Sequence, residues 1–315
     1  MSQTPPPLED FEPPPPVGRR RRKKSAPGVA VASLICGIFG LCCFPSGIFA
    51  LILGIVGLSK TGSPETSNGR GLAIAGTVLG GLSILMAPLM IAILLPALGA
   101  SRRTARLMQN STQLRGIHMG MTTFANSNKN NFPGLDSKGL ILIDSDQNTG
   151  NSGDGSTPQA RMWILLRGSY FTPEYAISPA ETDASITAYS GSGAVKPTDY
   201  SYALLDFETG SMTGNAYTVN PNSAGRVSEW KSTMSSRAVV ICDRNTGTNN
   251  DASVTSVFTG TPGEWRGGVV WNDNRVAVEN SHVVADTKYA SGTLNPQDNL
   301  YRDETAGNDA LLSHD

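Results

Sequence analysis

Histidine and cysteine are scarce in this chain, and familiar catalytic motifs are missing. The 315 residues include three histidines and four cysteines. Cys36, Cys42 and Cys43 share one apolar segment, so Cys242 is left alone and cannot build an intrachain disulfide framework in the rest of the chain. The sequence also lacks the GxSxG, HExxH, phosphate-loop and CxxC patterns that organise nucleophiles, metals or phosphates. We therefore expect a protein that is not an enzyme, with no catalytic residues and no cofactor.

Charge is missing from one long stretch. No acidic residue occurs between Glu65 and Asp136, and no charged residue of either sign occurs between Arg70 and Arg102. The apolar run at residues 72–98 exceeds the roughly 20 residues that a helix needs to cross a bilayer core. The stretch therefore predicts a membrane-spanning helix, with membrane lipid as a partner.

This apolar run continues without a turn signal into a basic and then amphipathic segment. Apolar side chains recur there at helical spacing and form one stripe, which consists of Leu107, Leu114, Ile117, Met121 and Phe124. The pattern predicts that residues 99–132 form a stalk helix continuous with the membrane helix. The last four residues of the stripe should be buried against a head domain, whereas Arg115 and Asn126 should be exposed.

The first 27 residues are rich in proline and basic side chains. This composition predicts a disordered tail at residues 1–27. The basic run at residues 19–24 has no interleaved aromatic residues and lies a few positions before an apolar segment. Its placement favours a positive-inside membrane anchor over nucleic-acid binding, so no nucleic-acid partner is expected. A proline-rich docking ligand is the alternative.

Residues 28–98 are predicted to form a membrane module. Its first apolar segment is interrupted by Pro45-Ser46-Gly47, and each arm is too short to cross a bilayer alone. We expect the two arms to enter and leave the membrane on one face, so that the chain crosses once. Gly76 and Gly80 lie four residues apart on one helix face, where small residues allow close helix packing.

Two observations conflict on the sidedness of the head. Arg102, Arg103 and Arg106 follow the apolar run, and positive charge favours the cytoplasmic side. A single crossing from a cytoplasmic tail would instead place the head outside. We predict a bacterial inner (cytoplasmic) membrane location with the head extracytoplasmic.

The module resembles a small membrane module known as the domain of unknown function 4190. The resemblance rests on a Ser-Leu-x-x-Gly opening, an Ile-Leu-Gly-x-x-x-Leu exit and a Gly-Arg-Gly-Leu-Ala-x-Ala-Gly re-entry. The matching residues are Ser33-Leu34, Gly37, Ile52-Leu53-Gly54, Leu58 and residues 69–76.

The composition changes from Ser127 onward, where Asn, Ser, Thr and Gly dominate. Short strand-like runs separated by turn residues predict an antiparallel sheet packed on the stalk helix, an α+β fold. The candidate strands are residues 140–143, 161–166, 200–205, 237–241, 267–271 and 275–278. The last two are predicted to form a hairpin joined by Asn272-Asp273-Asn274. We expect the β-rich head to occupy residues 133–290 and an acidic, flexible tail to occupy residues 291–315.

One loop has the alternating oxygen side chains that a calcium ion prefers. Its residues are Asp144, Asp146, Asn148 and Asp154. The match to an EF-hand loop fails because the sixth position is Thr149 and the twelfth is Gly155. A solvated turn is the alternative, and the simpler one.

The stalk and head resemble planctomycete-type pseudopilins, which are type II secretion system protein G-like. In these proteins an AILLPAL-like run is followed by a basic helix, a QLR-like step and an aromatic-Ala-Asn turn. The head then contains a Ser-Pro-x-x-x-Asp segment, a Tyr-Ser-Tyr-Ala strand, an Asp-Arg-Asn turn and a Gly-Gly hairpin. The matching residues are 92–98, 102–106, 113–115, 124–126, 178–183, 200–203, 243–245 and 267–276.

This resemblance implies a pilin-like fold and a structural or interaction role in or beside a type II secretion or pilus-like apparatus. Secretion-system or pilin-like subunits would then be partners. One departure is that Gly76 stands where the resemblance places the glutamate of the prepilin peptidase site. We therefore expect the chain to keep its N-terminal tail. The alternative function is an extracytoplasmic ligand-binding or sensor module with a cytoplasmic tail.

Overall fold

The computed structural model forms two compact units, Met1–Gly99 and Ala100–Asp315. It describes residues 28–40, 44–60, 70–143, 153–208, 211–213, 216–220, 223–290, 292–304 and 307–314. A single helix, α3 (Arg70–Ser127), begins in the first unit and ends in the second. The predicted continuity of the membrane and stalk segments is therefore confirmed.

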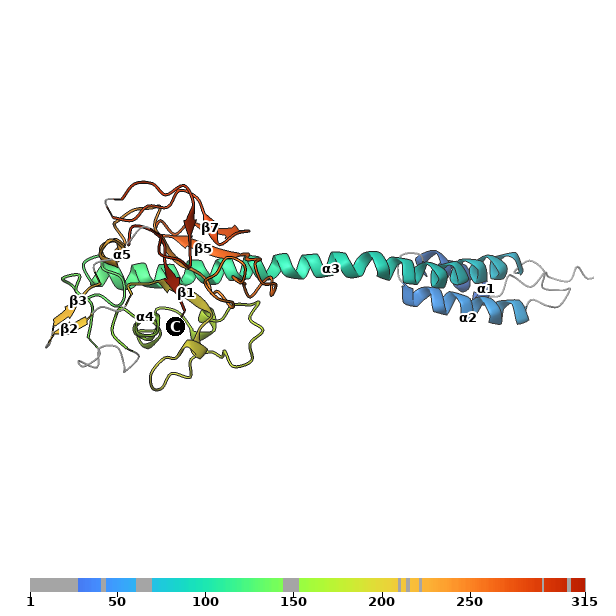
Figure 1. Ribbon diagram of the computed structural model, residues 1–315. Helices are drawn as coiled ribbons and strands as arrows, with labels where there is room; N and C mark the ends of the chain where they lie inside the picture. Colours follow the sequence, from blue (N-terminus) through green and yellow to red (C-terminus); the bar gives the residue numbers. More distant parts are fainter. Residues whose placement is uncertain are drawn as a thin grey trace, which may run out of the picture. The chain divides into compact units, whose positions relative to one another are not determined.

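The described residues of the first unit form two short helices and the start of α3. α1 (Gly28–Gly40) and α2 (Phe44–Lys60) lie side by side along the first part of α3 (Figure 1). The expected interruption at Pro45-Ser46-Gly47 is displaced, because these residues lie in the first turn of α2. Proline is tolerated in a first helical turn, where the missing N–H would have no intrahelical acceptor. Pro88 and Pro96 lie inside α3.

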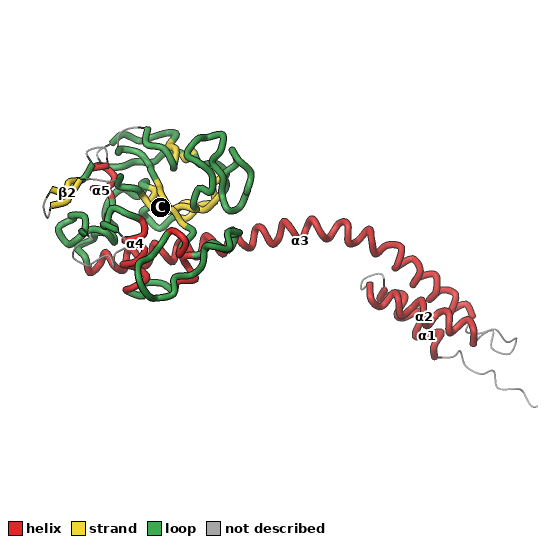
Figure 2. Tube along the Cα trace, turned by 60° about the horizontal axis from the view of Figure 1, so that its bottom comes forward, coloured by secondary structure: helices red, strands yellow, loops and turns green. Residues whose placement is uncertain are grey.

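The second unit, hereafter the head, is built around a five-stranded antiparallel sheet with the order β6-β5-β4-β1-β9. The strands are β1 (Tyr202–Leu205), β4 (Val239–Asp243), β5 (Gly267–Trp271), β6 (Val276–Glu279) and β9 (Leu312–Ser313). Two small two-stranded sheets pair β2 (Ser211–Thr213) with β3 (Ala216–Thr218) and β7 (Val283–Val284) with β8 (Asp298–Asn299). The short helices are α4 (Pro158–Arg167), α5 (Ala224–Glu229), η3 (Pro173–Ala176) and η4 (Pro197–Asp199). Figure 2 shows how much of the head is loop around these strands. The α+β fold class is confirmed.

The hairpin prediction is confirmed, and two strand predictions are wrong. β5 and β6 pair antiparallel, with Gly267 opposite Glu279 and Val270 opposite Val276. Residues 161–166, expected as a strand, form α4 instead. The start signal is local: the Thr157 side chain accepts a hydrogen bond from the backbone N–H of Ala160, and Pro158 follows the cap. Residues 140–143 form only an isolated bridge at Ile141.

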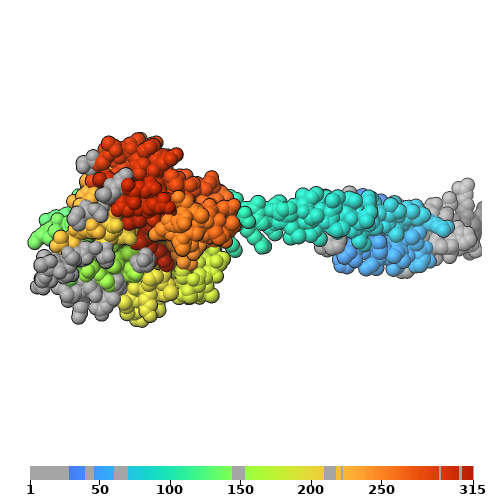
Figure 3. All heavy atoms as spheres, in the orientation of Figure 1, coloured from blue at the N-terminus to red at the C-terminus, as the bar shows by residue number. Residues whose placement is uncertain are grey.

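The end of the chain differs from the flexible tail that we expected. Residue 312 pairs with Leu205 across β9 and β1, and Asp298 pairs with Val284 across β8 and β7. Leu300 and Tyr301 are buried in the core. Figure 3 shows the C-terminal residues, in red, as part of the surface of the head. The acidic residues of this segment misled the prediction because several of them are internal ion-pair or hydrogen-bond partners.

The core of the head contains the face of α3 that the sequence predicts. Leu114, Ile117 and Met121 are fully buried, and Arg115 and Asn126 are exposed, as expected. Phe124 is only partly buried, so its predicted burial is wrong in degree.

Candidate functional site

Among the described residues of the first unit, hereafter the helical module, every buried position is a small residue. On α3 the buried positions are spaced by three and four residues, which places them on one face of the helix. They are Ala73, Gly76, Gly80, Ser83 and Ala87. The buried positions of α1 and α2 follow the same spacing and are also small: Ala30, Ser33, Gly37, Gly47, Ala50, Gly54 and Gly57. We call these residues the small-residue seam.

The seam brings the three backbones very close together. A Cβ added at Gly80 would lie 2.7 Å from the backbone nitrogen of Leu51, and one added at Gly54 would lie 2.9 Å from that of Thr77. A Cβ at Gly76 would lie 2.4 Å from the Ser33 hydroxyl. No side chain larger than hydrogen fits at these positions without displacing a helix, which gives the glycine spacing its physical reason.

Many large apolar side chains of the module are exposed. Their exposed set covers all three helices and includes Ile38, Phe39, Phe49, Val78, Leu85 and Leu95. This is the reverse of a water-soluble helix bundle, in which large apolar side chains fill the core. Among the described residues, α3 is the one helix long and apolar enough to cross a membrane. An apolar exterior of this kind is stable in lipid and costly in water.

A second site lies in the head, where α3 meets the sheet. The amide nitrogen of Asn110 donates to Oδ2 of Asp243 at 2.7 Å, and the backbone N–H of Gly268 donates to the same oxygen at 2.6 Å. The amide oxygen of Asn110 accepts hydrogen bonds from the hydroxyls of Tyr202 at 2.9 Å and Ser178 at 3.3 Å. We call these five residues the helix–sheet junction; they come from α3, β1, β4, β5 and one loop.

Gly268 lies where α3 crosses β5 at close range. A Cβ added at Gly268 would lie 2.3 Å from a methyl carbon of Leu114 and 3.0 Å from the Asn110 amide nitrogen. The hydrogen atom at this position lets α3 approach the strand closely. It also leaves room for the backbone N–H to reach Asp243.

Burial dominates the electrostatics of the junction. Burial raises the pKa of Asp243 to about 7. The hydrogen bonds from Gly268 and Asn110 favour the carboxylate and act in the opposite direction. Oδ1 of Asp243 has no hydrogen-bond partner among the described residues. The neighbouring thiol of Cys242 is also buried, and burial raises its pKa. Because a thiol is nucleophilic only as the thiolate, the raised pKa disfavours the reactive form of Cys242.

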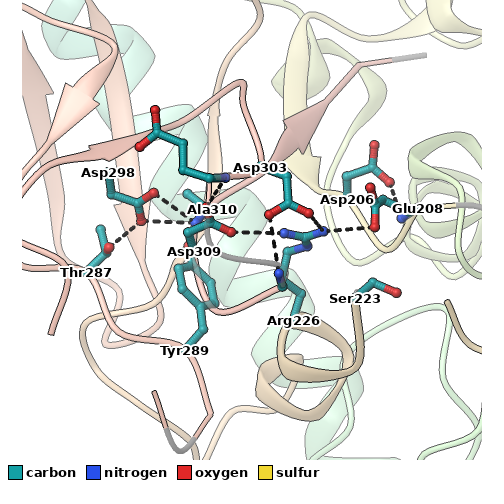
Figure 4. A network of polar contacts seen from close by, with 12 residues as sticks. Asp206, Glu208, Ser223, Arg226, Thr287, Tyr289, Asp298, Asp303, Asp309 and Ala310 are labelled. Carbon is teal, nitrogen blue, oxygen red and sulfur yellow. Dashed lines mark hydrogen bonds and ion pairs between the residues drawn. The ribbon is translucent and has the colours of Figure 1, made fainter. Parts of the chain in front are cut away.

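Two salt-bridged clusters support the head beyond the junction. The guanidinium of Arg226 is fully buried and lies 3.2–3.3 Å from carboxylate oxygens of Glu208, Asp303 and Asp309. Figure 4 shows the Arg226 side chain reaching from α5 to Asp303 and Asp309 of the C-terminal segment. In the same segment, Asp298 accepts from the backbone N–H of Ala310 at 3.0 Å. Just beyond the end of β4, the central strand, Arg244 donates to both oxygens of Glu181 at 2.9 and 3.0 Å.

A second buried cation, Arg161, lies in the aromatic core, and no described carboxylate forms an ion pair with it. Arg161 donates to the backbone carbonyls of Leu205 and Ser156 at 2.5 and 2.7 Å. Its guanidinium carbon lies 4.3 Å from the ring centre of Phe207 and 4.9 Å from that of Trp230. Burial lowers the pKa of Arg161 to about 10. Backbone carbonyls and aromatic rings therefore stabilise the guanidinium of Arg161. The sequence predicts a strand at this residue, which lies on α4.

Of the four residues of the predicted calcium loop, the structure describes one. Asp144, Asp146 and Asn148 lie outside the described residues, and Asp154 is half-buried beside the start of α4. Within the described ranges, no group of three or more His, Cys, Asp or Glu side chains is arranged to hold a metal ion.

The three histidines lie apart. His118 is buried on α3, where its ring meets that of Phe132 edge-on at 5.8 Å. Burial lowers the pKa of His118 to about 4, although Asn272, Asp273 and Asn274 favour the protonated form. Neither ring nitrogen forms a hydrogen bond of normal geometry with the described residues. His282 contacts Asp251 at 3.2 Å, and His314 contacts the carbonyl of Tyr200 at 2.8 Å.

Sequence reasoning missed Asn110 and the buried arginines. Asn110 follows a basic stretch and looks like an exposed helix residue, because its partners are more than sixty positions away. One signal was present: Asn110 lies three residues beyond Leu107 and four before Leu114, on the apolar stripe. A polar residue on an apolar face indicates a buried hydrogen-bonding site.

Comparison with known proteins identifies only the helical module. Residues 29–92 match the family described as Domain of unknown function (DUF4190). No curated protein and no solved structure matches the chain. A DUF4190 domain is therefore present, and it coincides with the three-helix unit that contains the small-residue seam.

Proposed function

We propose that this is a non-enzymatic, membrane-anchored, pseudopilin-like protein with a structural or interaction role in or beside a type II secretion or pilus-like apparatus. The observation that carries the proposal is the change from exposed to buried side chains along α3. Every residue at positions 88–106 of α3 is exposed, whereas Leu107 and the stripe beyond it are buried in the head. One helix thus provides both an apolar anchor and the spine of a folded domain.

The helix–sheet junction supports the pseudopilin-like part of the proposal. The four head motifs that carry the resemblance are far apart in sequence, and they supply residues to a single set of contacts. Ser178, Tyr202, Asp243 and Gly268 each belong to one of these motifs, and all four interact around Asn110 of α3. Residues that lock a stalk helix to a sheet are what a shared fold would retain.

The presence of Gly76 where the pseudopilin resemblance places a glutamate also has a physical reason. Gly76 lies in the small-residue seam, and even one added carbon would contact Ser33. A glutamate there would separate α1 from α3. We therefore propose that helix packing in the module requires glycine at the position of the peptidase-site glutamate. The prepilin peptidase would then not cleave the protein, and the mature chain would keep residues 1–27.

We further propose that the chain crosses the bacterial cytoplasmic membrane once, with the head outside. Gly57 near the end of α2 lies beside Ala30 near the start of α1 and Ala73 near the start of α3. The start of α1, the end of α2 and the start of α3 therefore lie at one end of the unit. With 13 and 17 residues, α1 and α2 reach only ~20 and ~26 Å, less than the ~30 Å bilayer core. A hairpin that enters and leaves on the cytoplasmic face fits these lengths.

Cysteine accessibility tests this topology. In full-length protein with the native cysteines replaced, a membrane-impermeant maleimide applied to intact spheroplasts should label a cysteine at Thr182 and not one at Ser2. Both positions should react after the membrane is permeabilised. Labelling of the cysteine at Ser2 alone would show the opposite orientation. Labelling of neither site before permeabilisation would place both the tail and the head inside and refute a single crossing.

Site-specific cross-linking in native membranes tests the proposed role. Met119 lies on the exposed face of α3, with 57% of its surface accessible, and Leu140 on a loop is similarly exposed at 61%. A photo-cross-linker at position 119 should capture pilin-like or secretion-system subunits, whereas one at position 140 should capture far less. Equal or absent capture of such subunits at both positions would contradict the proposal.

A groove in the head favours ligand binding as the second candidate function. It has a volume of about 720 Å³ and a polar lining that includes Ser156, Asp206, Glu208, Asn245, Tyr301 and His314. Glu208 adopts a φ of 47°, which a residue with a side chain rarely does. Binding of a polyhydroxylated ligand such as an oligosaccharide to the full chain, lost in Glu208→Gln and kept in Glu279→Gln, would favour a sensor over an assembly role.

A further inference from the structure

The two ends of the membrane module differ in how many helices they contain. Contacts through the small-residue seam join α1 and α2 to α3 from Ala73 to Gly80, and Ala87 is the last residue of α3 in this unit that is buried. From residue 88 to residue 99 every position of α3 is exposed. The described part of the module is therefore three helices thick at one end and one helix thick at the other.

The single-helix end is apolar on all sides. Its exposed side chains include Leu89, Met90, Ile91, Ile93, Leu94, Leu95 and Leu98. Ile91 and Leu95 lie on one face, and Ile93 lies on the opposite side of the same turn, since successive residues are separated by about 100° around a helix. A protein partner covers one face of a helix, whereas acyl chains surround it. Lipid is therefore the occupant that fits this segment.

The lengths place the change in thickness within the bilayer. The apolar run at residues 72–98 is a helix of ~40 Å, and the hairpin covers only its first ~24 Å at ~1.5 Å per residue. A bilayer core of ~30 Å can be placed anywhere along this run. In every placement, the leaflet at the α1–α2 end contains three helices and the opposite surface contains one.

We infer that the DUF4190 module is a wedge that prefers membranes in which the leaflet on the tail side is expanded. The inference rests on the proposed membrane anchoring. Two additional helices of ~10 Å diameter occupy area in one leaflet and not in the other. A membrane that curves so that the tail-side leaflet is the convex one relieves this asymmetry, and the opposite curvature increases it. The partner is thus a lipid surface of defined curvature.

Vesicles of different diameter test the wedge with the full-length protein. Insertion into preformed vesicles keeps the polar head outside, so the wide end of the wedge lies in the inner, concave leaflet. The density of fluorescently labelled protein per unit of vesicle area should therefore fall about twofold or more between vesicles of ~200 nm and ~30 nm diameter, since binding to lipid surfaces depends on curvature. Density that is constant, or that rises on small vesicles, would overturn the inference.

A deletion variant is the matched control. Removal of residues 28–60 leaves the basic tail, α3 and the head but reduces the module to one helix. This variant should show equal density on large and small vesicles. A diameter dependence equal to that of the full chain would assign the effect to the head or the tail and would refute the wedge.

Two further readouts separate the competing outcomes. Flotation of the full chain with vesicles tests the membrane anchoring itself, so failure to float contradicts the proposed function rather than the wedge. Photobleaching of single vesicles at low protein density counts the copies per particle. A majority of two-step traces would place a second copy, and not lipid, on residues 88–98 and would overturn the inference.

Discussion

The helical module and the head place opposite kinds of residue inside. Among the described residues of the module, the buried positions are all Gly, Ala or Ser, and many large apolar side chains are exposed. The largest buried side chains all belong to the head and include Trp230, Trp271 and Tyr289. The two regions share one helix, so the contrast cannot come from helix geometry.

The surrounding solvent accounts for the difference. In water, burial of large apolar side chains stabilises a fold by about 25 cal/mol per Å². In lipid this driving force between helices disappears, so close backbone contact between small residues becomes the main source of packing. The module should therefore be sensitive to added volume, and the head should be sensitive to removed volume.

The largest effect is expected from Gly80→Leu in the module. The new side chain would meet the α2 backbone at Leu51 and Gly47, where a Cβ already lies at 2.7 and 3.0 Å. Backbone cannot move aside as a side chain can, so α2 should separate from α3. Cysteines at Gly57 and Ala73 report the packing, because a Cβ at Gly57 would lie 3.2 Å from that of Ala73. In otherwise cysteine-free protein this disulfide should form readily and be lost in Gly80→Leu.

The adjacent glycine supplies the control. A Cβ at Gly81 would lie 3.9 Å from a methyl carbon of Leu51, an ordinary contact. Gly81→Leu adds the same volume and hydrophobicity and should keep the disulfide. If the two variants cross-link equally, the seam does not hold the module together.

The second effect is expected from Trp230→Ala in the head. The Trp230 ring lies edge-on to Phe132 at 5.4 Å and Phe207 at 5.5 Å, and its N–H donates to the carbonyl of Pro133 at 2.7 Å. Truncation leaves a cavity and an unpaired carbonyl, which should lower the free energy of unfolding by ~3–5 kcal/mol. Urea denaturation of the full chain in detergent, followed by near-UV circular dichroism, measures the loss. Leu140→Ala, at an exposed site, should change it by less than about 0.5 kcal/mol.

The sequence predicted the contrast in outline but not the contacts that produce it. Periodicity identified the buried side of α3 because Leu114, Ile117 and Met121 repeat locally, and turn chemistry identified the β5–β6 hairpin. The helix–sheet junction could not be predicted because Asn110 and Asp243 are 133 positions apart. Arg161 was placed on a strand because the apolar run after it has no helical period of its own, and the cap at Thr157 decided the outcome.

The third effect concerns pH. Burial raises the pKa of Asp243 to about 7 from an ordinary value of 3.8. The unfolded carboxyl ionises above pH 3.8 while the folded one stays protonated, so the head loses stability as the pH rises from about 4 to 7. Asp243→Asn keeps an acceptor for Asn110 and Gly268 and removes the ionisation. Its unfolding free energy relative to wild type should increase with pH, by on the order of 4 kcal/mol between pH 3 and pH 8.

His118 acts in the opposite direction over the same window. Its pKa is lowered to about 4 from 6.5, so its contribution to stability is lost as the pH falls from 6.5 toward 4. Wild type and Asp243→Asn both contain His118, so their difference at each pH isolates the carboxyl. A difference that does not change between pH 4 and pH 8 would show that Asp243 is ionised in the fold.

The smallest effect is expected from Phe124→Ala, at the last position of the apolar stripe. Phe124 is partly exposed and its main ring contact is Tyr170, edge-on at 5.7 Å. Because water already reaches the ring, its removal should cost ~1–2 kcal/mol, less than the ~2–5 kcal/mol expected for the fully buried Met121→Ala. A double-mutant cycle with Tyr170→Ala should give a coupling energy of ~0.5–1.5 kcal/mol, as for other edge-to-face pairs. A cost for Phe124 equal to that for Met121 would mean that the ring is covered in the native protein. The cover would then come from outside the described residues or from a partner on this end of α3.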